Sequence, residues 1–323
     1  MTVEVIRDLK SLLEFRPQWA SFARECKAVT PFQLPEWLLP WWQCFGSGTL
    51  QVFVFSEGPA LTGVIPCFLH DWDGARQLTL IGSGISDYLE PATDPQHSAA
   101  MVECLESHLR SRSDWDRCNW QDLSACTPLK AMASQVLDDT PCTEIPLTGG
   151  FEEYWAARSA NLRRNVHRDD KKLAALGKVQ FCATREGELK LVDKLLQLHT
   201  ARWQKHGEPG MVRANGLAEF LRHAALELAR EKMLRIFSLK LEEKVVAIIL
   251  SIAYRGTLFN YLTGFDPCYE TAGVGRRLLF EAIRYGFGNG FKAWNFLRGD
   301  EPYKSWWGAR PIAKCRVIVK RTS

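Results

Sequence analysis

Residues 270–277 read Glu-Thr-Ala-Gly-Val-Gly-Arg-Arg and lead from a loop into an amphipathic helix. The two glycines of this stretch, Gly273 and Gly275, let the backbone approach a ligand closely at the helix start. Amide groups there point outward, and the helix dipole favours a negative charge beside them. Arg276 and Arg277 add positive charge at the same end. The stretch therefore predicts an anion site.

The glycine pair does not belong to either of two common phosphate-binding motifs. A dinucleotide fingerprint needs a third glycine and a βαβ setting, whereas the strands before residue 270 are joined by hairpins. The sequence also lacks the G-x-x-x-x-G-K-[ST] pattern of a P-loop. Without a ligand, the same glycines describe an ordinary glycine-rich turn, and this alternative stays open at the level of the motif.

Three predicted strands precede the glycine pair, and a helix and a strand follow it. β-Branched and aromatic runs bounded by turn residues predict the strands, at 234–241, 245–254, 257–263 and 293–296. The helix is predicted at 273–287. The first half repeats this order, at 50–55, 61–69, 76–81, 98–112 (helix) and 118–123. The two copies lie about 180 residues apart, which is too long a period for a solenoid. The first copy enters its helix as Asp-Pro-Gln-His-Ser at 94–98, without a glycine pair.

The repeat predicts a mixed α/β chain with two similar domains, each a mostly antiparallel twisted sheet flanked by helices. The turn-rich stretch at 146–150 places the boundary between 1–147 and 148–323. Further helices are predicted at 35–45, 151–176 with a break at 159–161, 192–203 with Gly207 as its stop, and 217–228.

Composition narrows the class of protein. The 323 residues are 46% hydrophobic, a content that excludes a disordered chain. The net charge of +4 is too small to indicate binding to nucleic acid. The start of the sequence does not resemble a signal peptide, and the apolar run at 245–254 is about half the length of a membrane span. Ten cysteines without a C-x-x-C pair predict reduced thiols in a cytoplasmic protein. We find no metal-ligand spacing and expect no metal.

Hairpin-linked strands followed by x-x-x-G-x-G and a helix resemble the acyl-CoA-binding core of the GNAT acyltransferases. The family motif Q/R-x-x-G-x-G/A matches residues 270–275, with Glu270 where Gln or Arg is usual. Most of the chain resembles the tandem-GNAT branch that includes the CelD-like acetyltransferases and the Fem peptidyltransferases. The stretches that carry this resemblance are Ser86-Asp87-Tyr88, Leu162-Arg163-Arg164-Asn165, His199-x-x-Arg202-Trp203, Gly264-Phe265-Asp266 and residues 299–307.

The resemblance implies an acyl-CoA-dependent N-acyltransferase with two tandem GNAT-like domains. Direct transfer in a ternary complex would carry an acetyl or longer acyl group to an amine or hydroxyl. The acceptor would be a small molecule, a carrier-bound group or an envelope-related polysaccharide precursor. The second domain would bind acyl-CoA, and the first, with a degenerate cofactor site, would serve the acceptor. The implied cofactor-binding residues are Leu262, Thr263, Gly264, Thr271, Ala272, Gly273, Val274, Gly275, Arg276 and Arg277.

Residues 298–304 are the strongest candidates for the chemistry, because acyl transfer needs a base, a proton donor and a polarised carbonyl. Glu301 is the candidate base, Tyr303 the candidate proton donor to the departing sulfur, and Lys304 the candidate for stabilising an oxyanion. A turn whose charges pair with one another is the alternative. Asp87 of the first copy is the candidate for binding or deprotonating the acceptor amine, with an Asx-turn as its alternative.

Four further residues are candidates for substrate binding. Tyr88 follows Asp87, Trp203 belongs to the His-x-x-Arg-Trp stretch, and Asp266 follows the strand implied to hold pantetheine. Arg164 lies in the run 158–172, whose net charge of +4 suits an anionic acceptor, a carrier-bound acyl group or the CoA 3′-phosphate. The ordinary alternatives are packing residues, a turn-forming aspartate and a solvated helix face.

Two other functions remain open. A Fem-like enzyme would take aminoacyl groups from tRNA or acyl groups from an acyl-carrier protein, and the basic helix suits either anion. A non-catalytic GNAT-like scaffold in polysaccharide biosynthesis is favoured by Glu270, the residue that departs from the motif.

Overall fold

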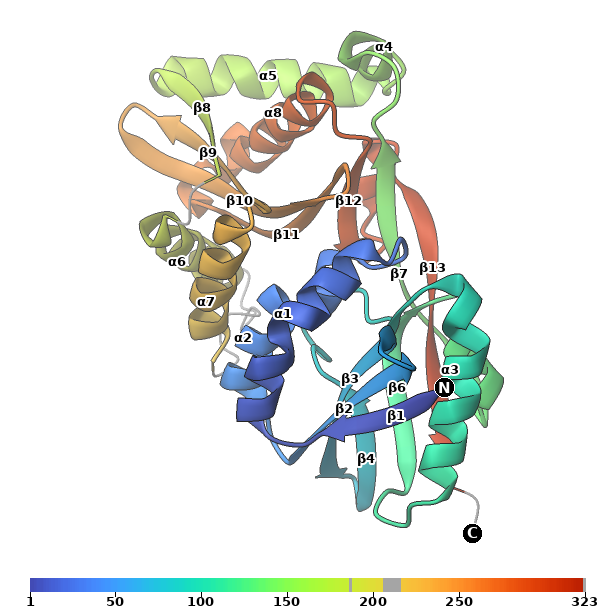
Figure 1. The fold of residues 1–323 in the computed structure, drawn as a ribbon. Coiled ribbons are helices and arrows are strands. Elements are labelled where there is room, and N and C mark those ends of the chain that lie inside the picture. Colours follow the sequence, from blue (N-terminus) through green and yellow to red (C-terminus); the bar gives the residue numbers. More distant parts are fainter. Residues whose placement is uncertain (186–187, 206–215, 322–323) are drawn as a thin grey trace. The chain divides into compact units, whose positions relative to one another are not determined.

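The computed structural model describes residues 1–185, 188–205 and 216–321, and its ribbon is drawn in Figure 1. The chain forms two compact units. Unit 1 contains residues 1–140 and 313–323, and unit 2 contains residues 141–312. The predicted helix stop at Gly207 lies outside the described residues.

Unit 1 is built on a sheet with the strand order β1-β2-β3-β4-β6-β13. Neighbouring strands are antiparallel except β4 and β6, which run parallel. The strands are β1 (Thr2–Ile6), β2 (Thr49–Glu57), β3 (Ala60–Trp72), β4 (Ala75–Leu80), β6 (Arg117–Ser124) and β13 (Arg310–Lys320), with a short β5 (Ala92–Thr93) beside β3. The helices are α1 (Leu9–Glu25), α2 (Pro35–Phe45) and α3 (Pro95–Arg110), with 3₁₀ turns at Pro31–Gln33 and Pro128–Met132.

Unit 2 repeats this arrangement with the order β8-β9-β10-β11-β12 followed by the second half of β7. Again one pair, β11 and β12, is parallel and the others are antiparallel. The strands are β7 (Gln135–Pro146), β8 (Val179–Thr184), β9 (Leu234–Leu241), β10 (Lys244–Tyr254), β11 (Thr257–Phe265) and β12 (Ala293–Arg298). The helices are α4 (Phe151–Ala156), α5 (Ala160–Leu176), α6 (Leu189–Lys205), α7 (Leu217–Arg230), α8 (Val274–Gly288) and α9 (Pro302–Trp306), with a 3₁₀ turn η4 (Pro267–Ala272).

The repeated order predicted from the sequence is confirmed in both units. The last strand of each sheet, however, comes from an unexpected part of the chain. In unit 1 the strand beside β6 is β13, which is the last strand of the sequence. In unit 2 the strand beside β12 is the end of β7, which directly follows unit 1 in sequence. The chain therefore crosses between the units near residues 140 and 312, whereas the sequence predicted one boundary at 147/148.

Helices α5 and α8 pack together on one side of the sheet of unit 2, and α6 and α7 lie on the other side (Figure 1). The buried stripe of α5 consists of Leu162, Val166, Asp169 and Leu173. The helix begins at the predicted break, where the side chain of Ser159 accepts a hydrogen bond from the Leu162 amide at 3.2 Å. This cap holds the start of α5 and so fixes which residues of α5 face α8.

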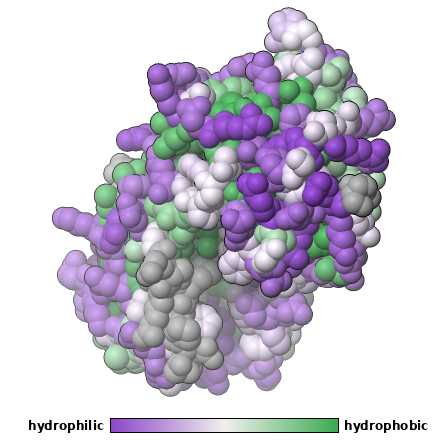
Figure 2. Space-filling view, turned by 90° about the horizontal axis from the view of Figure 1, so that it is seen from below, coloured by the Kyte–Doolittle hydropathy of each residue, from purple (hydrophilic) through white to green (hydrophobic). Residues whose placement is uncertain are grey.

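The described surface carries only scattered large apolar side chains. On the face drawn in Figure 2, hydrophobic residues form separate patches among hydrophilic ones. Trp306 is 54% exposed and Tyr303 is 39% exposed, and both belong to the segment that follows β12. In the described part of the chain, the helices are too short or too polar to span a membrane.

Candidate functional site

The parallel strands β11 and β12 separate after a short paired region. Their pairing covers Thr257–Phe259 of β11 against Ala293–Asn295 of β12. Beyond this point β11 stays paired with β10 as far as Phe265, while β12 pairs with β7. The divergence leaves the edge of β11 that faces β12 unpaired with that strand from Asn260 onward.

A cavity of about 250 Å³ opens beside this edge. Its lining residues come from β10, β11, η4, the start of α8, the segment of α9 and the end of α6. The residues that line it are Arg202, Ile249, Asn260, Thr263, Phe265, Glu270, Gly273, Gly275, Arg276, Leu279, Tyr303, Trp306 and Trp307. The glycine pair and the segment after β12, two separate predictions from the sequence, thus border one cavity.

The start of α8 presents backbone amides near this cavity. Gly273 is the N-cap in the left-handed region, with φ of 75°, and its carbonyl accepts the first helical hydrogen bond from Arg277. Among the described residues, none accepts a hydrogen bond from the amides of Val274, Gly275 or Arg276. These are the donors that a helix N-terminus leaves unpaired. They are the amides expected to contact an anion.

The surroundings of Gly273 correct one expectation. A Cβ atom on Gly273 would lie 2.1 Å from the carboxyl carbon of Asp169, so the space beside this glycine is filled by a protein carboxylate. Asp169 is 1% exposed and accepts a hydrogen bond from Arg276 Nε at 2.6 Å. Arg277 pairs in the same way with Asp170 at 2.9 Å. The two arginines therefore neutralise α5 and do not provide the free positive charge predicted at this helix end.

The segment after β12 is fixed by a buried lysine. Lys304 is 3% exposed, and its Nζ donates to the carbonyls of Arg298 (2.8 Å) and Gly299 (3.1 Å) and lies 2.8 Å from the Glu301 carboxylate. An ammonium group has three donors, and these partners use all of them. In this structure Lys304 holds the turn together. The turn therefore has charges that pair with one another, which is the alternative that the sequence left open.

Replacing Lys304 with methionine tests this structural role. The substitution keeps the apolar stem and leaves two carbonyls without a donor, so we expect the free energy of unfolding to fall by about 1–3 kcal/mol. Urea denaturation measures the loss, with Glu301→Gln as the control, because Glu301 is 56% exposed and its pairing is worth less. Unchanged stability together with a large fall in kcat would instead support the oxyanion role.

Tyr303, the candidate proton donor, lines the cavity. Desolvation in the cavity, followed by the negative charge of Glu301, raises the pKa of its phenol to about 12. Its ring packs edge-on against Phe296 at 6.0 Å. The phenol therefore stays protonated at neutral pH, as a proton donor must.

The segment is supported from α4. Tyr154 donates a hydrogen bond from its hydroxyl to the carbonyl of Trp307 at 2.7 Å, and Trp155 stacks on the Trp307 ring at 6.0 Å. Trp307 is 2% exposed, and it lines the cavity together with the exposed Trp306. The packing of α4 thus fixes α9 and the aromatic wall of the cavity.

Several residues predicted to bind the cofactor lie outside the lining of this cavity. Gly264 permits close packing of α6, because a Cβ there would lie 2.8 Å from the His199 amide and from the Leu195 carbonyl. Thr271 is exposed, and its carbonyl accepts a hydrogen bond from Lys172. Leu262, Ala272 and Val274 are buried core residues, and Arg277 faces α5. Thr263, Gly273, Gly275 and Arg276 are the predicted cofactor residues that line the cavity.

Two predicted substrate-binding residues have structural partners in unit 2. Asp266 caps η4 by accepting a hydrogen bond from the Cys268 amide at 3.0 Å, and it pairs with Lys244 at 2.7 Å. Trp203 packs against His199, whose Nδ1 lies 3.1 Å from the Thr263 carbonyl. Burial lowers the pKa of His199, so this imidazole is neutral at pH 7.

Arg164 lies on the exposed outer side of α5. The acidic residues Asp169 and Asp170 of the same helix are turned to α8, where they pair with its arginines. The outer side of α5, with Arg164, therefore lies away from the two aspartates of that helix.

Asp87 and Tyr88 belong to unit 1 and are both 9% exposed. Their loop is fixed by the amide of Gln33, which donates to the Tyr88 carbonyl, and by the Trp37 indole, which donates to Ser86, both at 2.9 Å. The Nζ of Lys314, from β13, lies 4.1 Å from the centre of the Tyr88 ring. Tyr88 is thus a packed residue of unit 1.

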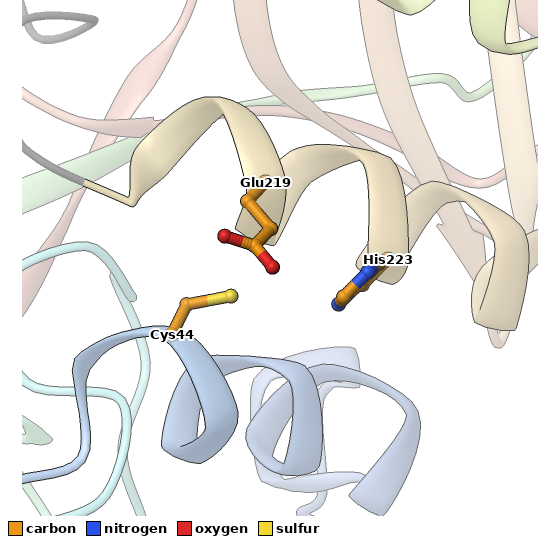
Figure 3. A group of neighbouring side chains, drawn as sticks. All are labelled: Cys44, Glu219 and His223. Carbon is orange, nitrogen blue, oxygen red and sulfur yellow. The ribbon is translucent and has the colours of Figure 1, made fainter.

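A possible metal-binding group does not provide a site within either unit. Figure 3 shows Glu219 and His223 one turn apart on the same side of α7, together with Cys44 of α2. Cys44 belongs to unit 1 and the other two belong to unit 2. Two ligands from one helix are fewer than a protein metal site uses, and the group carries no metal assignment.

Comparison with known proteins identifies the class of this fold. Residues 160–305 match the family model of the acetyltransferase (GNAT) domain, which confirms the resemblance seen in the sequence. The matched region contains β11, α8, β12 and nearly all of α9, and so most of the cavity described above. This part of the chain is therefore similar to the acetyltransferase (GNAT) domain.

The fold of the chain is similar to that of three solved structures at low sequence identity. FemX shares 9% identity over 99% of this chain and 98% of its own, with a TM-score of 0.69. The protein L-PGS from Bacillus licheniformis shares 13% identity over 95% of this chain and 92% of its own, with a TM-score of 0.61. The C-terminal domain of a putative lysylphosphatidylglycerol synthetase from Agrobacterium fabrum shares 11% over 94% and 92%, also at 0.61. No curated protein matches by sequence.

Proposed function

We propose that this chain transfers an acyl group from an acyl-CoA thioester to an amine or hydroxyl acceptor, with the cavity of unit 2 as the donor site. The observation that supports this most is the cavity itself. It lies where β11 and β12 separate, next to unpaired amides of α8 and to a protonated tyrosine. A thioester arm entering along the open edge of β11 would bring its sulfur toward Tyr303.

The proposed step breaks the C–S bond of the thioester as the acceptor nitrogen or oxygen forms a bond to the same carbonyl carbon. The acceptor loses one proton, and the departing thiolate gains one from the phenol of Tyr303. Glu301, two residues away on the same turn, is the proposed base that takes the proton of the acceptor. Holding both reactants together supplies much of the rate enhancement.

Replacing Gly275 tests the donor site. A Cβ at this position would lie 3.0 Å from the Phe265 ring, at the edge of the cavity. Gly275→Val is expected to abolish saturable binding of acetyl-CoA, measured by calorimetry, while the melting temperature of the protein changes little. Gly288→Val is the matched control, because a Cβ there meets no atom within 4 Å. Retained affinity in Gly275→Val would contradict the proposed donor site.

A second donor class is favoured by Asp169. Its carboxylate fills the space beside Gly273, at the helix end where a CoA diphosphate would otherwise bind. This favours a carrier-bound acyl or aminoacyl donor, from an acyl-carrier protein or from tRNA. Release of free thiol from acetyl-CoA, followed with a sulfhydryl reagent, would support the CoA donor, and transfer from a carrier without such release would support the second class.

A further inference from the structure

The cavity contains an arginine that is held by aromatic rings. Arg202 lies in the last turn of α6 and lines the cavity. Its guanidinium carbon lies 4.7 Å from the centre of the Phe265 ring and 5.6 Å from that of Trp203. Contacts of this kind orient an arginine through its planar face and leave the N–H groups at its edge for a ligand.

The other charged residues that line the cavity are neutralised within the protein. Glu270 pairs with Lys205 at 2.8 Å, and Arg276 pairs with Asp169 at 2.6 Å. No carboxylate of the described residues lies within ion-pair distance of Arg202. Among the described residues, the charge that the cavity offers to a ligand is therefore positive and belongs to Arg202.

We propose that Arg202 is a specificity-determining residue that binds an anionic group of the donor, a phosphate of its carrier arm or a carboxylate on its acyl group. The inference rests on the proposed function of the cavity as the donor site. A guanidinium edge matches either anion, because it forms two parallel N–H···O bonds to a phosphate or a carboxylate.

The position of Arg202 offers a replacement for the favourable contact that an anion loses when a glutamate, Glu270, stands at the first position of the glycine motif. Lys205, one turn further along α6, neutralises Glu270. Arg202 then supplies, from a different helix, the positive charge that the motif lacks. Arg202 and Lys205 together give α6 a role in the donor site that the glycine motif alone does not indicate.

The test compares probes that differ in one group, with binding followed by calorimetry and by tryptophan fluorescence. CoA, 4′-phosphopantetheine and pantetheine differ in phosphate content, and succinyl- and acetyl-pantetheine differ in one carboxylate. Inorganic pyrophosphate is a probe that does not depend on the donor being a thioester. The variants are Arg202→Gln and Arg202→Lys, with Arg230→Gln as a control that removes the same charge from an exposed position on α7.

If Arg202 binds a phosphate, Arg202→Gln should weaken binding of CoA and 4′-phosphopantetheine about 10- to 100-fold and leave pantetheine unchanged. If it binds an acyl carboxylate, the same variant should remove the preference for succinyl- over acetyl-pantetheine. In both cases Arg202→Lys should retain part of the affinity, and Arg230→Gln should behave as the wild type.

An equal loss for charged and uncharged probes, or no loss for any of them, would overturn the inference. If the wild type binds pyrophosphate through Arg202 but none of the CoA-derived probes, the CoA donor fails and the role of Arg202 stands. If the wild type binds none of the anionic probes, the proposed role of Arg202 is wrong.

Discussion

Replacing Tyr303 with phenylalanine is expected to lower kcat by about 100- to 10,000-fold, the contribution typical of a positioned general acid. The variant keeps the ring that packs on Phe296 and removes the hydroxyl that is the proposed proton donor. Binding of the donor should change little, because the proposed proton transfer occurs in the transition state. Steady-state kinetics with the preferred donor measures both effects.

The pH dependence provides a second check on Tyr303. Because the pKa of its phenol is raised to about 12, the proton-donating form persists throughout the neutral and mildly alkaline range. The activity of the wild type should therefore show no fall from loss of this proton below about pH 11. A fall in kcat near pH 9, or a Tyr303→Phe variant with unchanged kcat, would contradict the assignment. Tyr285→Phe is a suitable control, because Tyr285 packs in the core of unit 2.

Replacing Gly273 with alanine is expected to give the largest loss of stability among the single substitutions considered. Alanine must adopt the left-handed φ of 75°, and its Cβ would lie 2.1 Å from the carboxyl carbon of Asp169. Asp169 would have to leave its buried position, which breaks its pair with Arg276. We expect the free energy of unfolding to fall by about 3–5 kcal/mol, the range for breaking a buried ion pair.

Gly290→Ala separates the two causes of this loss. Gly290 has a similar φ of 72°, but a Cβ there meets no atom within 4 Å. It should therefore show only the backbone cost of about 1–2 kcal/mol. Equal losses in the two variants, measured by urea denaturation, would mean that the carboxylate of Asp169 does not occupy the space beside Gly273.

The sequence was sufficient for the repeated order of strands, because each run has a clear β-branched or aromatic pattern between turn residues. It was not sufficient for the strands that complete the sheets. β7 includes two prolines, which weaken its strand pattern, and β13, although it contains the β-branched run 317–319, gives no local sign of its partner. Lys314 of β13 pairs with Ser124, 190 residues away, and Pro146 of β7 pairs with Ala293, 147 residues away. No local signal encodes such pairing.

The candidate site was predictable in part. The G-x-G spacing indicated the glycine pair, and the charged turn at 298–304 indicated Tyr303. The pairing of Asp169 with Arg276 was not, because it depends on how α5 packs against α8. Arg202 was visible only as a member of a short stretch, and its role depends on the aromatic ring of Phe265, sixty-three residues away.

The sheet of unit 1 is completed by β13, the last strand of the sequence, and this sets the order in which the two units can be completed during synthesis. β6 is made by residue 124, but β13, its neighbour in the sheet, begins at residue 310. At about 5–20 residues per second, the ribosome needs roughly 10–40 s to make the intervening chain. During that time the nascent sheet of unit 1 has an unpaired edge, which is the kind of surface that chaperones bind and that aggregates recruit. Unit 1 is thus first in sequence and last to mature.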